Sequence, residues 1–133
     1  MKILNIASLK KSVILGMANA TTVDMFKENS VILLTAAGMI SGKLIEKSDL
    51  ESFDQTDKSA LSTFTVATIA QKSKEEFDKQ SDSELNVTGN DGYIILKDVH
   101  VTNVSGQTMF FSALTVFFDQ IIGVTLGSVQ VNN

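Results

Sequence analysis

Residues 3–18 carry apolar side chains at intervals of three and four positions, with polar side chains and lysines between them. This spacing places the apolar residues on one face and predicts an amphipathic helix. The polar stretch 19–22 interrupts the pattern, and Thr21 or Thr22 is placed to cap a short second helix. We therefore expect residues 1–30 to form a helical segment, either one interrupted helix or two short ones.

The pattern changes in residues 31–35, an apolar run that is too short for a helix and rich in β-branched residues. A turn follows at Gly38. In the return stretch 39–46, Gly42 lies between two apolar residues of the same strand face. A glycine in the middle of a strand allows a sharp bend, which a short sheet needs in order to close into a barrel. The pattern predicts a hairpin with a bent second strand.

The middle of the chain is acidic, because residues 48–92 carry ten acidic residues against four lysines, a net charge of −6. Within it, residues 63–69 alternate polar and apolar, which predicts a strand with one solvated face. Residues 73–77 predict one or two helical turns. Since both ends of the segment are polar, we interpret residues 50–92 as an acidic insertion outside the sheet.

The last third contains further strands, which we predict at residues 93–103, 108–118 and 121–131. Several of these segments are apolar on both faces, notably Phe117 and Phe118. A sheet with one solvated face would not tolerate this arrangement. We expect either the amino-terminal helices or another subunit to cover the second face.

Together these patterns predict one domain, mainly β or α+β, with an N-terminal helix and a small five-stranded antiparallel barrel. Residues 31–49 and 93–131 would form the barrel strands. Adjacent residues of a strand point to opposite faces, so an error of one residue in register exchanges the inward and outward side chains. The sequence leaves this choice open between adjacent apolar residues. The predicted core residues are Ile32, Leu34, Ile40, Leu44, Ile94, Leu96, Leu114, Val116, Ile122 and Val124.

Composition narrows the function classes. The 133 residues are 44% hydrophobic and 20% charged, as expected for one globular domain. We find no apolar run of membrane-spanning length, and Lys10 and Lys11 interrupt the place where a secretory leader needs apolar residues, so we expect a cytoplasmic protein. The absence of cysteine excludes disulfides and thiolate metal sites. All eleven basic residues are lysines, which disfavours nucleic-acid recognition through arginine.

Candidate chemistry is sparse. His100, the single histidine, follows Asp98 by two positions, but no nucleophile motif such as Gly-x-Ser-x-Gly accompanies the pair. The acids near Asp49 and Asp57 lack the spacing of a calcium loop. We expect no catalytic residue, no cofactor and no metal site. Tyr93, the single tyrosine, is the candidate ligand contact, because it is an aromatic residue with a polar tip.

Residues 31–44, followed by Asp49, resemble the first motif of the Sm-like family of small five-stranded barrels. The shared features are an apolar strand, a turn glycine, a strand glycine four residues on, a leucine and a later acid. Residues 93–99 are similar to the family's third strand, and residues 114–124 occupy the place of its second motif. The resemblance implies a barrel with a tendency to form rings.

The RNA-binding members of that family hold a base with an Asp-x-x-x-Asn sequence and an Arg-Gly or lysine-containing pair. Tyr93 stands at the asparagine position here, and Phe118-Asp119 or Phe117-Phe118 stands at the Arg-Gly position. The acidic insertion would also repel phosphate groups. The resemblance therefore implies the fold without the RNA site.

We expect a non-enzymatic interaction or scaffolding module that self-associates by pairing the edges of its last two strands, with Phe117, Phe118 and Val124 at the interface. The partner would be a second copy of the chain, with no membrane and no small-molecule substrate inferred. The alternative is an Sm-like RNA-binding protein that uses the lysines of the amino-terminal half. Those lysines are Lys10, Lys11, Lys27, Lys43 and Lys47.

Overall fold

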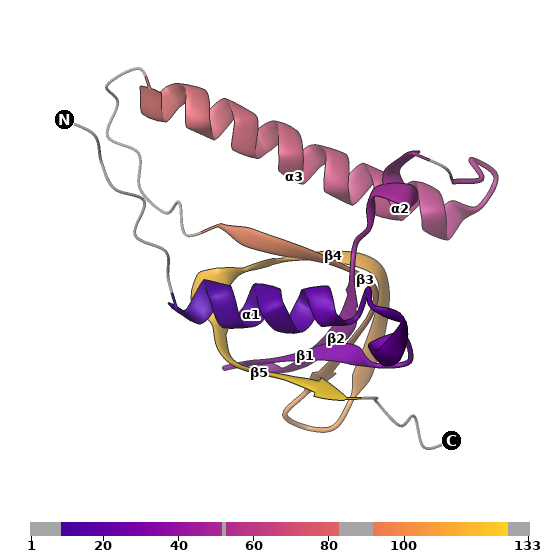
Figure 1. Ribbon diagram of the computed structural model, residues 1–133, viewed down its shortest axis with the longest axis vertical. Coiled ribbons are helices and arrows are strands. Elements are labelled where there is room, and N and C mark those ends of the chain that lie inside the picture. The colour runs from indigo at the N-terminus through magenta and orange to yellow at the C-terminus, as the bar shows by residue number, and fades with distance from the viewer. Residues whose placement is uncertain (1–8, 52, 83–91, 128–133) are drawn as a thin grey trace.

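Five antiparallel strands form one sheet in the order β4-β3-β2-β1-β5, as the computed structural model shows (Figure 1). The structure describes residues 9–51, 53–82 and 92–127. The strands are β1 (Ser30–Thr35), β2 (Gly38–Leu44), β3 (Tyr93–Asn103), β4 (Thr108–Phe117) and β5 (Ile121–Gly127). The helices are α1 (Leu9–Ala20), η1 (Asp24–Phe26), α2 (Lys47–Glu51), α3 (Lys58–Asp82) and η2 (Phe118–Gln120).

The predicted fold class, an N-terminal helix with a five-stranded antiparallel sheet, is confirmed. The predicted closure into a barrel is wrong, because no pairing joins β4 to β5 among the described residues. Helix α1 lies across the curved strands (Figure 1), and its Ile14 and Ala18 are buried among the core residues of the sheet. The side chains of α1 thus cover the inner face of the curved sheet, although the outer strands β4 and β5 do not pair with each other.

Helix α1 matches the expected amphipathic helix for its described part, and the predicted residues 1–8 lie outside the described residues. The expected cap at Thr21 or Thr22 is wrong. Their hydroxyl groups donate to the carbonyl oxygens of Ala18 and Asn19, each at 2.7 Å. The threonines therefore satisfy carbonyls at the end of α1, and η1 begins without a side-chain cap.

Strands β1 and β2 form the expected hairpin, in which Thr35 pairs with Gly38. Gly38 has a φ of 148°, and a Cβ there would collide with the carbonyl oxygen of Thr102. The adjoining pairing of β2 with β3 changes register between Ser41 and Lys43. The close approach of β3 at this turn explains why glycine occupies position 38.

The register change places Gly42 opposite an irregularity in β3, where Asp98 adopts a φ of 51°. A Cβ on Gly42 would lie 3.1 Å from the Cβ of Leu96 and 3.1 Å from the carbonyl oxygen of Lys97. One extra residue on one strand bends the ladder and increases its twist. The bend expected at Gly42 thus coincides with a bulge in the neighbouring strand.

The predicted strand at residues 63–69 is wrong, since these residues belong to α3. The carboxylate of Asp57 accepts hydrogen bonds from the backbone N–H groups of Ser59 and Ala60, which caps the helix. Within the helix, the hydroxyl of Thr65 donates to the carbonyl of Leu61 four residues earlier. The alternation of threonines with apolar residues is typical of a strand. The buried residues Thr63 and Ala67, however, are four positions apart, which is the spacing of one helical face.

The core lies between α1 and the sheet. In β1 the buried residues are Val31 and Leu33 instead of the predicted Ile32 and Leu34, and in β5 Ile121 is buried instead of Ile122. A continuous apolar run offers the same side chains in either register, so periodicity alone did not decide the inward face. Among the other predicted core residues, the buried ones are Ile40, Ile94, Leu96 and Val116, and the partly buried ones are Leu44, Leu114 and Val124.

Candidate functional site

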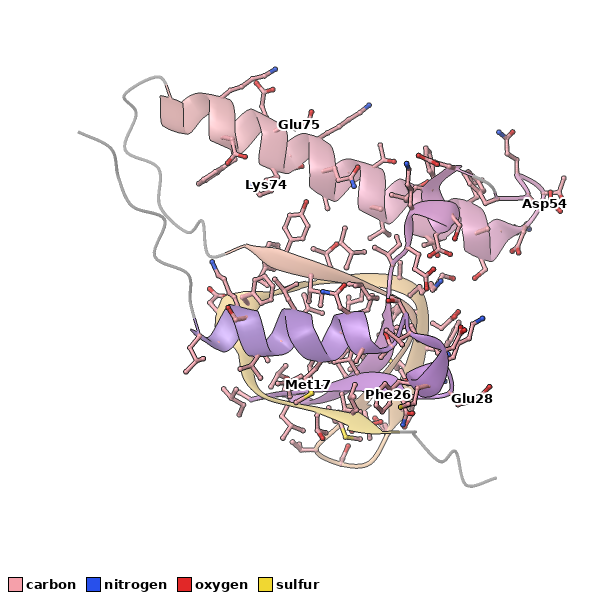
Figure 2. All side chains as sticks on the ribbon, in the orientation of Figure 1. Met17, Phe26, Glu28, Asp54, Lys74 and Glu75 are labelled. Carbon is pink, nitrogen blue, oxygen red and sulfur yellow. The ribbon has the colours of Figure 1, made fainter. Side chains whose placement is uncertain are left out.

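Helix α3 and the ends of β3 and β4 line a cavity of about 450 Å³ that is open to solvent, which we call the helix–sheet cavity. Apolar side chains from α3, including Val66 and Phe77, form one wall, and Phe117 of β4 forms part of the other. Lys74 and Tyr93 supply its charged and phenolic groups. Figure 2 shows Lys74 on the side of α3 that faces the sheet, whereas Glu75 lies on the other side.

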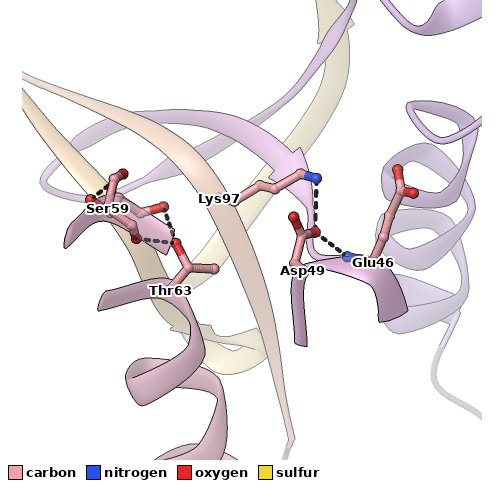
Figure 3. Close-up of polar contacts among 6 residues, drawn as sticks. Glu46, Asp49, Ser59, Thr63 and Lys97 are labelled. Atoms are coloured by element: carbon pink, nitrogen blue, oxygen red, sulfur yellow. Dashed lines mark hydrogen bonds and ion pairs between the residues drawn. The ribbon is translucent and has the colours of Figure 1, made fainter. Parts of the chain in front are cut away.

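The first half of α3 fixes the position of this cavity. Ala67 is fully buried, and Thr63 is buried at 7% exposure. The hydroxyl of Thr63 lies within hydrogen-bonding distance of two backbone carbonyl oxygens, that of Ser59 one helical turn earlier at 3.0 Å and that of Ser112 in β4 at 3.3 Å (Figure 3). The hydroxyl of Ser59 donates to the hydroxyl oxygen of Ser112 at 2.9 Å. The small side chain of Ala67 allows the helix to approach the sheet closely at this point.

Pairing of β3 with β4 explains why Ser112 is available to α3. Lys97 pairs with Ala113 and Val99 pairs with Phe111, while the intervening residues form no regular pair. The contacts of Ser59 and Thr63 with Ser112 dock α3 on β4, opposite the unusual backbone of Asp98 in β3.

Tyr93, the candidate ligand contact, lies at the beginning of β3 and lines the cavity. Its ring meets that of Phe117 edge to face, with centroids 6.4 Å apart. Burial raises the pKa of the Tyr93 phenol, the nearby Lys74 ammonium lowers this pKa, and Asp78 and Glu75 raise it. The phenol is accordingly neutral at neutral pH and able to donate a hydrogen bond.

Lys74 pairs with Asp78 one helical turn later, at 2.8 Å between Nζ and Oδ2. This hydrogen bond raises the pKa of the Lys74 amino group. The side chains are about half exposed, at 47% and 48%. An ammonium group has three donors, so Lys74 can bind an additional acceptor without releasing Asp78.

A second polar cluster joins α2 to the sheet. The Asp49 carboxylate accepts a hydrogen bond from Lys97 of β3 at 2.8 Å and another from the backbone N–H of Glu46, also at 2.8 Å (Figure 3). The Lys97–Asp49 pair is less than a quarter exposed on either side. Asp49 thus stabilises the beginning of α2 and anchors it to the sheet.

The other acids between residues 49 and 57 have local partners. Asp57 caps α3, Lys47 pairs with Glu51 at 3.7 Å, and hydrogen bonds from the hydroxyl and N–H of Thr56 lower the pKa of Asp54. Within the described parts of the chain, no three His, Cys, Asp or Glu side chains are placed to hold a metal ion.

The outer strands expose large apolar side chains. Met109, Phe110 and Phe111 at the start of β4 are 56%, 56% and 39% exposed, and Ile122 of β5 is 74% exposed. We call these four residues, three on β4 and one on the opposite outer strand β5, the apolar edge surface. The ring of His100, the single histidine, packs edge to face against the ring of Phe110, with centroids 5.2 Å apart.

The structure brings together Tyr93 and Phe117 of the residues named from sequence. Phe118, expected at an interface, is instead 5% exposed in the core, and the amino group of Lys11 lies 5.8 Å above its ring. Phe118 is the first residue of η2, the short link between β4 and β5, and its side chain is buried there. Val124 is partly buried and packs against the same core.

Sequence reasoning missed the contribution of α3 to the cavity. Val66, Ala70, Lys74 and Phe77 follow one another at intervals of four, four and three residues, which places them on one helical face. This helical spacing can be read from the sequence. It was missed because residues 63–69 were predicted to form a strand.

The lysines of the alternative RNA-binding function lie apart. Lys10 and Lys11 are at the start of α1, whereas Lys27 follows η1 beyond the other end of that helix. The Lys43 amino group donates to the backbone carbonyl of Lys27, and Lys47 is engaged with Glu51.

Comparisons with protein-family models, with curated proteins and with solved structures find no match to the chain. Among the described helices, none combines the length and apolar character needed to cross a membrane.

Proposed function

We propose that this protein is a non-enzymatic interaction module that self-associates through the edge strands of its sheet. One observation carries the proposal: β4 and β5 are the outer strands of an open antiparallel sheet, and they expose the apolar edge surface. An unpaired strand edge is a template for pairing with another chain. Large exposed apolar side chains beside such an edge favour association because burial removes them from water.

The covered part of β4 restricts how two copies can meet. Helix α3 contacts β4 at Ser112, so the free stretch of that strand is Thr108–Phe111. We expect this stretch to pair with β5 of a second copy. Because the two paired surfaces differ, each added copy leaves one free edge of each kind, and the assembly is either a ring or a filament.

The resemblance to the Sm-like family supports the same proposal. An N-terminal helix, a hairpin with Gly38 at its turn, a strand bent at Gly42 and a short link between the last two strands occur in that order. We therefore propose an Sm-like module that keeps the ring-forming tendency of the family but lacks its RNA-binding residues.

Sedimentation velocity tests self-association. At about 100 µM, above the micromolar range in which many specific interfaces persist, we expect the wild-type chain to sediment as an oligomer. Phe110→Lys and Ile122→Lys place a charge in the apolar edge surface and should each shift the protein toward the monomer. A monomer for the wild-type chain at this concentration would contradict the proposal.

Met25→Lys is the matched control, since Met25 is 82% exposed and lies in η1, which is part of neither outer strand. It should leave the oligomer unchanged. Far-ultraviolet circular dichroism of each variant establishes that the fold is intact. If the control dissociated the oligomer as fully as Phe110→Lys, the assignment of the interface to the sheet edges would be wrong.

A further inference from the structure

We propose that the helix–sheet cavity binds a free amphipathic molecule with an unbranched apolar chain and a single carboxylate head. The chain would lie between Val66 and Phe77 of α3 and Phe117 of β4, and the head would bind Lys74 and Tyr93. This site is distinct from the apolar edge surface.

The size and lining of the cavity fit the chain. Its volume of about 450 Å³ falls within the range of roughly 300–1,000 Å³ that is usual for small-molecule sites. Val66, Ala70 and Phe77 present aliphatic and aromatic surface from α3. Ile69 and Phe117, which also line the cavity, are 61% and 56% exposed, so an apolar ligand would remove them from water.

The polar groups fit a carboxylate. Lys74 carries a positive charge with donors to spare beyond its bond to Asp78, and the neutral phenol of Tyr93 adds another donor. A carboxylate accepts hydrogen bonds from both groups, and bonds that involve a charged partner are the stronger ones. A cationic head would be repelled by Lys74, and an uncharged head would accept a hydrogen bond from Lys74 without the attraction between opposite charges.

The carboxyl groups near the site set a limit on the head. Asp78 and Glu75 of α3 both act on Tyr93. A head with two negative charges would meet more repulsion from these carboxylates than a head with one charge. The single charge of a carboxylate is therefore the better match.

The composition of the chain supplies a direct probe. Tyr93 is the single tyrosine and the chain has no tryptophan, so tyrosinate absorbance reports on this cavity alone. A bound carboxylate beside Tyr93 disfavours the tyrosinate anion and excludes water from it. Binding should therefore move the alkaline titration of Tyr93 to higher pH.

Isothermal titration calorimetry with dodecanoate below its micelle concentration, combined with titration of Tyr93 absorbance, tests the proposal. We expect saturable binding of one dodecanoate per chain and an upward shift of the Tyr93 titration. Dodecyltrimethylammonium should bind roughly tenfold or more weakly. Equal affinity for the cationic amphiphile, or the absence of saturable binding, would overturn the proposal.

Variants locate the site. Ala70→Phe fills the cavity and should abolish dodecanoate binding, while Lys74→Met should weaken it roughly tenfold. Lys72→Met, on an exposed position of the same helix, should bind as the wild-type chain does. Unchanged binding by both Ala70→Phe and Lys74→Met would overturn the assignment, and Lys74→Met keeps the test decisive if Ala70→Phe fails to fold.

A third arm separates a free amphiphile from a lipid surface. Vesicles of phosphatidylglycerol present anionic heads on a membrane, and we expect them not to shift the Tyr93 titration. Binding to vesicles without binding to dodecanoate would contradict the proposal. Because the oligomer is measured by sedimentation, failure of dodecanoate binding and failure of self-association give different results.

Discussion

The sheet has a helix on each of two sides, and these helices serve it differently. In α1, Ile14 and Ala18 are 1% and 0% exposed and belong to the core. In the longer α3, Ala67 is fully buried, yet Ile69 two residues later is 61% exposed. The short helix completes the interior (Figure 1). The long helix docks through Thr63 and Ala67 and leaves a cavity between Val66 and Phe77 and the sheet.

The two helices therefore differ in role: α1 contributes to the stability of the fold, and α3 leaves apolar surface for a ligand. Burying an aliphatic side chain stabilises the fold in proportion to the apolar area removed from water, which favours complete packing under α1. A helix–sheet contact that is left incomplete keeps apolar surface available to a ligand. We therefore expect substitutions under α1 to change the free energy of unfolding and substitutions along the second half of α3 to change binding.

The largest effect should come from Ile14→Ala. Removing a fully buried isoleucine side chain leaves a cavity and typically lowers the free energy of unfolding by about 2–5 kcal/mol. Ile69→Ala removes a similar side chain from the exposed part of α3 and should change this free energy by about 0.5 kcal/mol or less. Urea denaturation of both variants provides the comparison, and similar losses for the two would contradict it.

Gly42→Val should have the next largest effect. A side chain at the β2 bend would press against Leu96 and the backbone of Lys97, and such overpacking typically lowers the free energy of unfolding by about 1–3 kcal/mol. Gly16→Ala is the matched control, because a Cβ at this α1 position meets no atom within 4 Å. It should stabilise the protein by about 0.4–1 kcal/mol. Thermal unfolding within a degree of wild type for Gly42→Val would refute the account of the bend.

Ala67→Glu should undock α3 while leaving the core intact. A carboxylate cannot be buried against β4 without a partner, so the helix would move away from the sheet. Hydrogen exchange should then show faster exchange in β4 around Ser112 and unchanged protection in the β1–β2 hairpin. Loss of protection throughout the sheet would show that α3 is as necessary to the core as α1.

The smallest effect concerns the titration of Tyr93. Because the Lys74 charge lowers the pKa of this phenol, Lys74→Met should raise it further, whereas Lys72→Met should not. Since the folded-state pKa lies above the unfolded value near 10, the corresponding stability is complete below about pH 10 and is lost as pH rises through the folded-state pKa. Absorbance titration measures the first effect, and denaturation above pH 10 measures the second. A lower Tyr93 pKa in Lys74→Met would contradict the placement of the ammonium.

Sequence reasoning succeeded where local pattern and glycine position agreed. The hairpin of β1 and β2 followed from a short β-branched run, a turn at Gly38 and alternation around Gly42. It failed at residues 63–69, where threonines that alternate with apolar residues satisfy both a strand and a helix. The choice between Ile121 and Ile122 failed because adjacent apolar residues carry no information about which one faces inward.

The candidate site was predictable only in part. The amphipathic tip of Tyr93 identified one of its residues, but the cavity depends on where α3 lies relative to β4. That placement is set by the contacts of Ser59 and Thr63 with Ser112, which join residues far apart in the sequence. Because residues 63–69 were predicted as a strand, the helical face that lines the cavity, including Lys74, could not be predicted either.

Hydrogen exchange at two protein concentrations tests most directly whether the protein self-associates through its outer strands β4 and β5. Between about 1 µM and about 100 µM, a specific interface in the micromolar range becomes populated. We predict that the backbone amides of Thr108–Phe111 and β5 gain protection at the higher concentration, whereas those between β1 and β2 do not change. Identical exchange at both concentrations, or added protection confined to α3, would contradict the account.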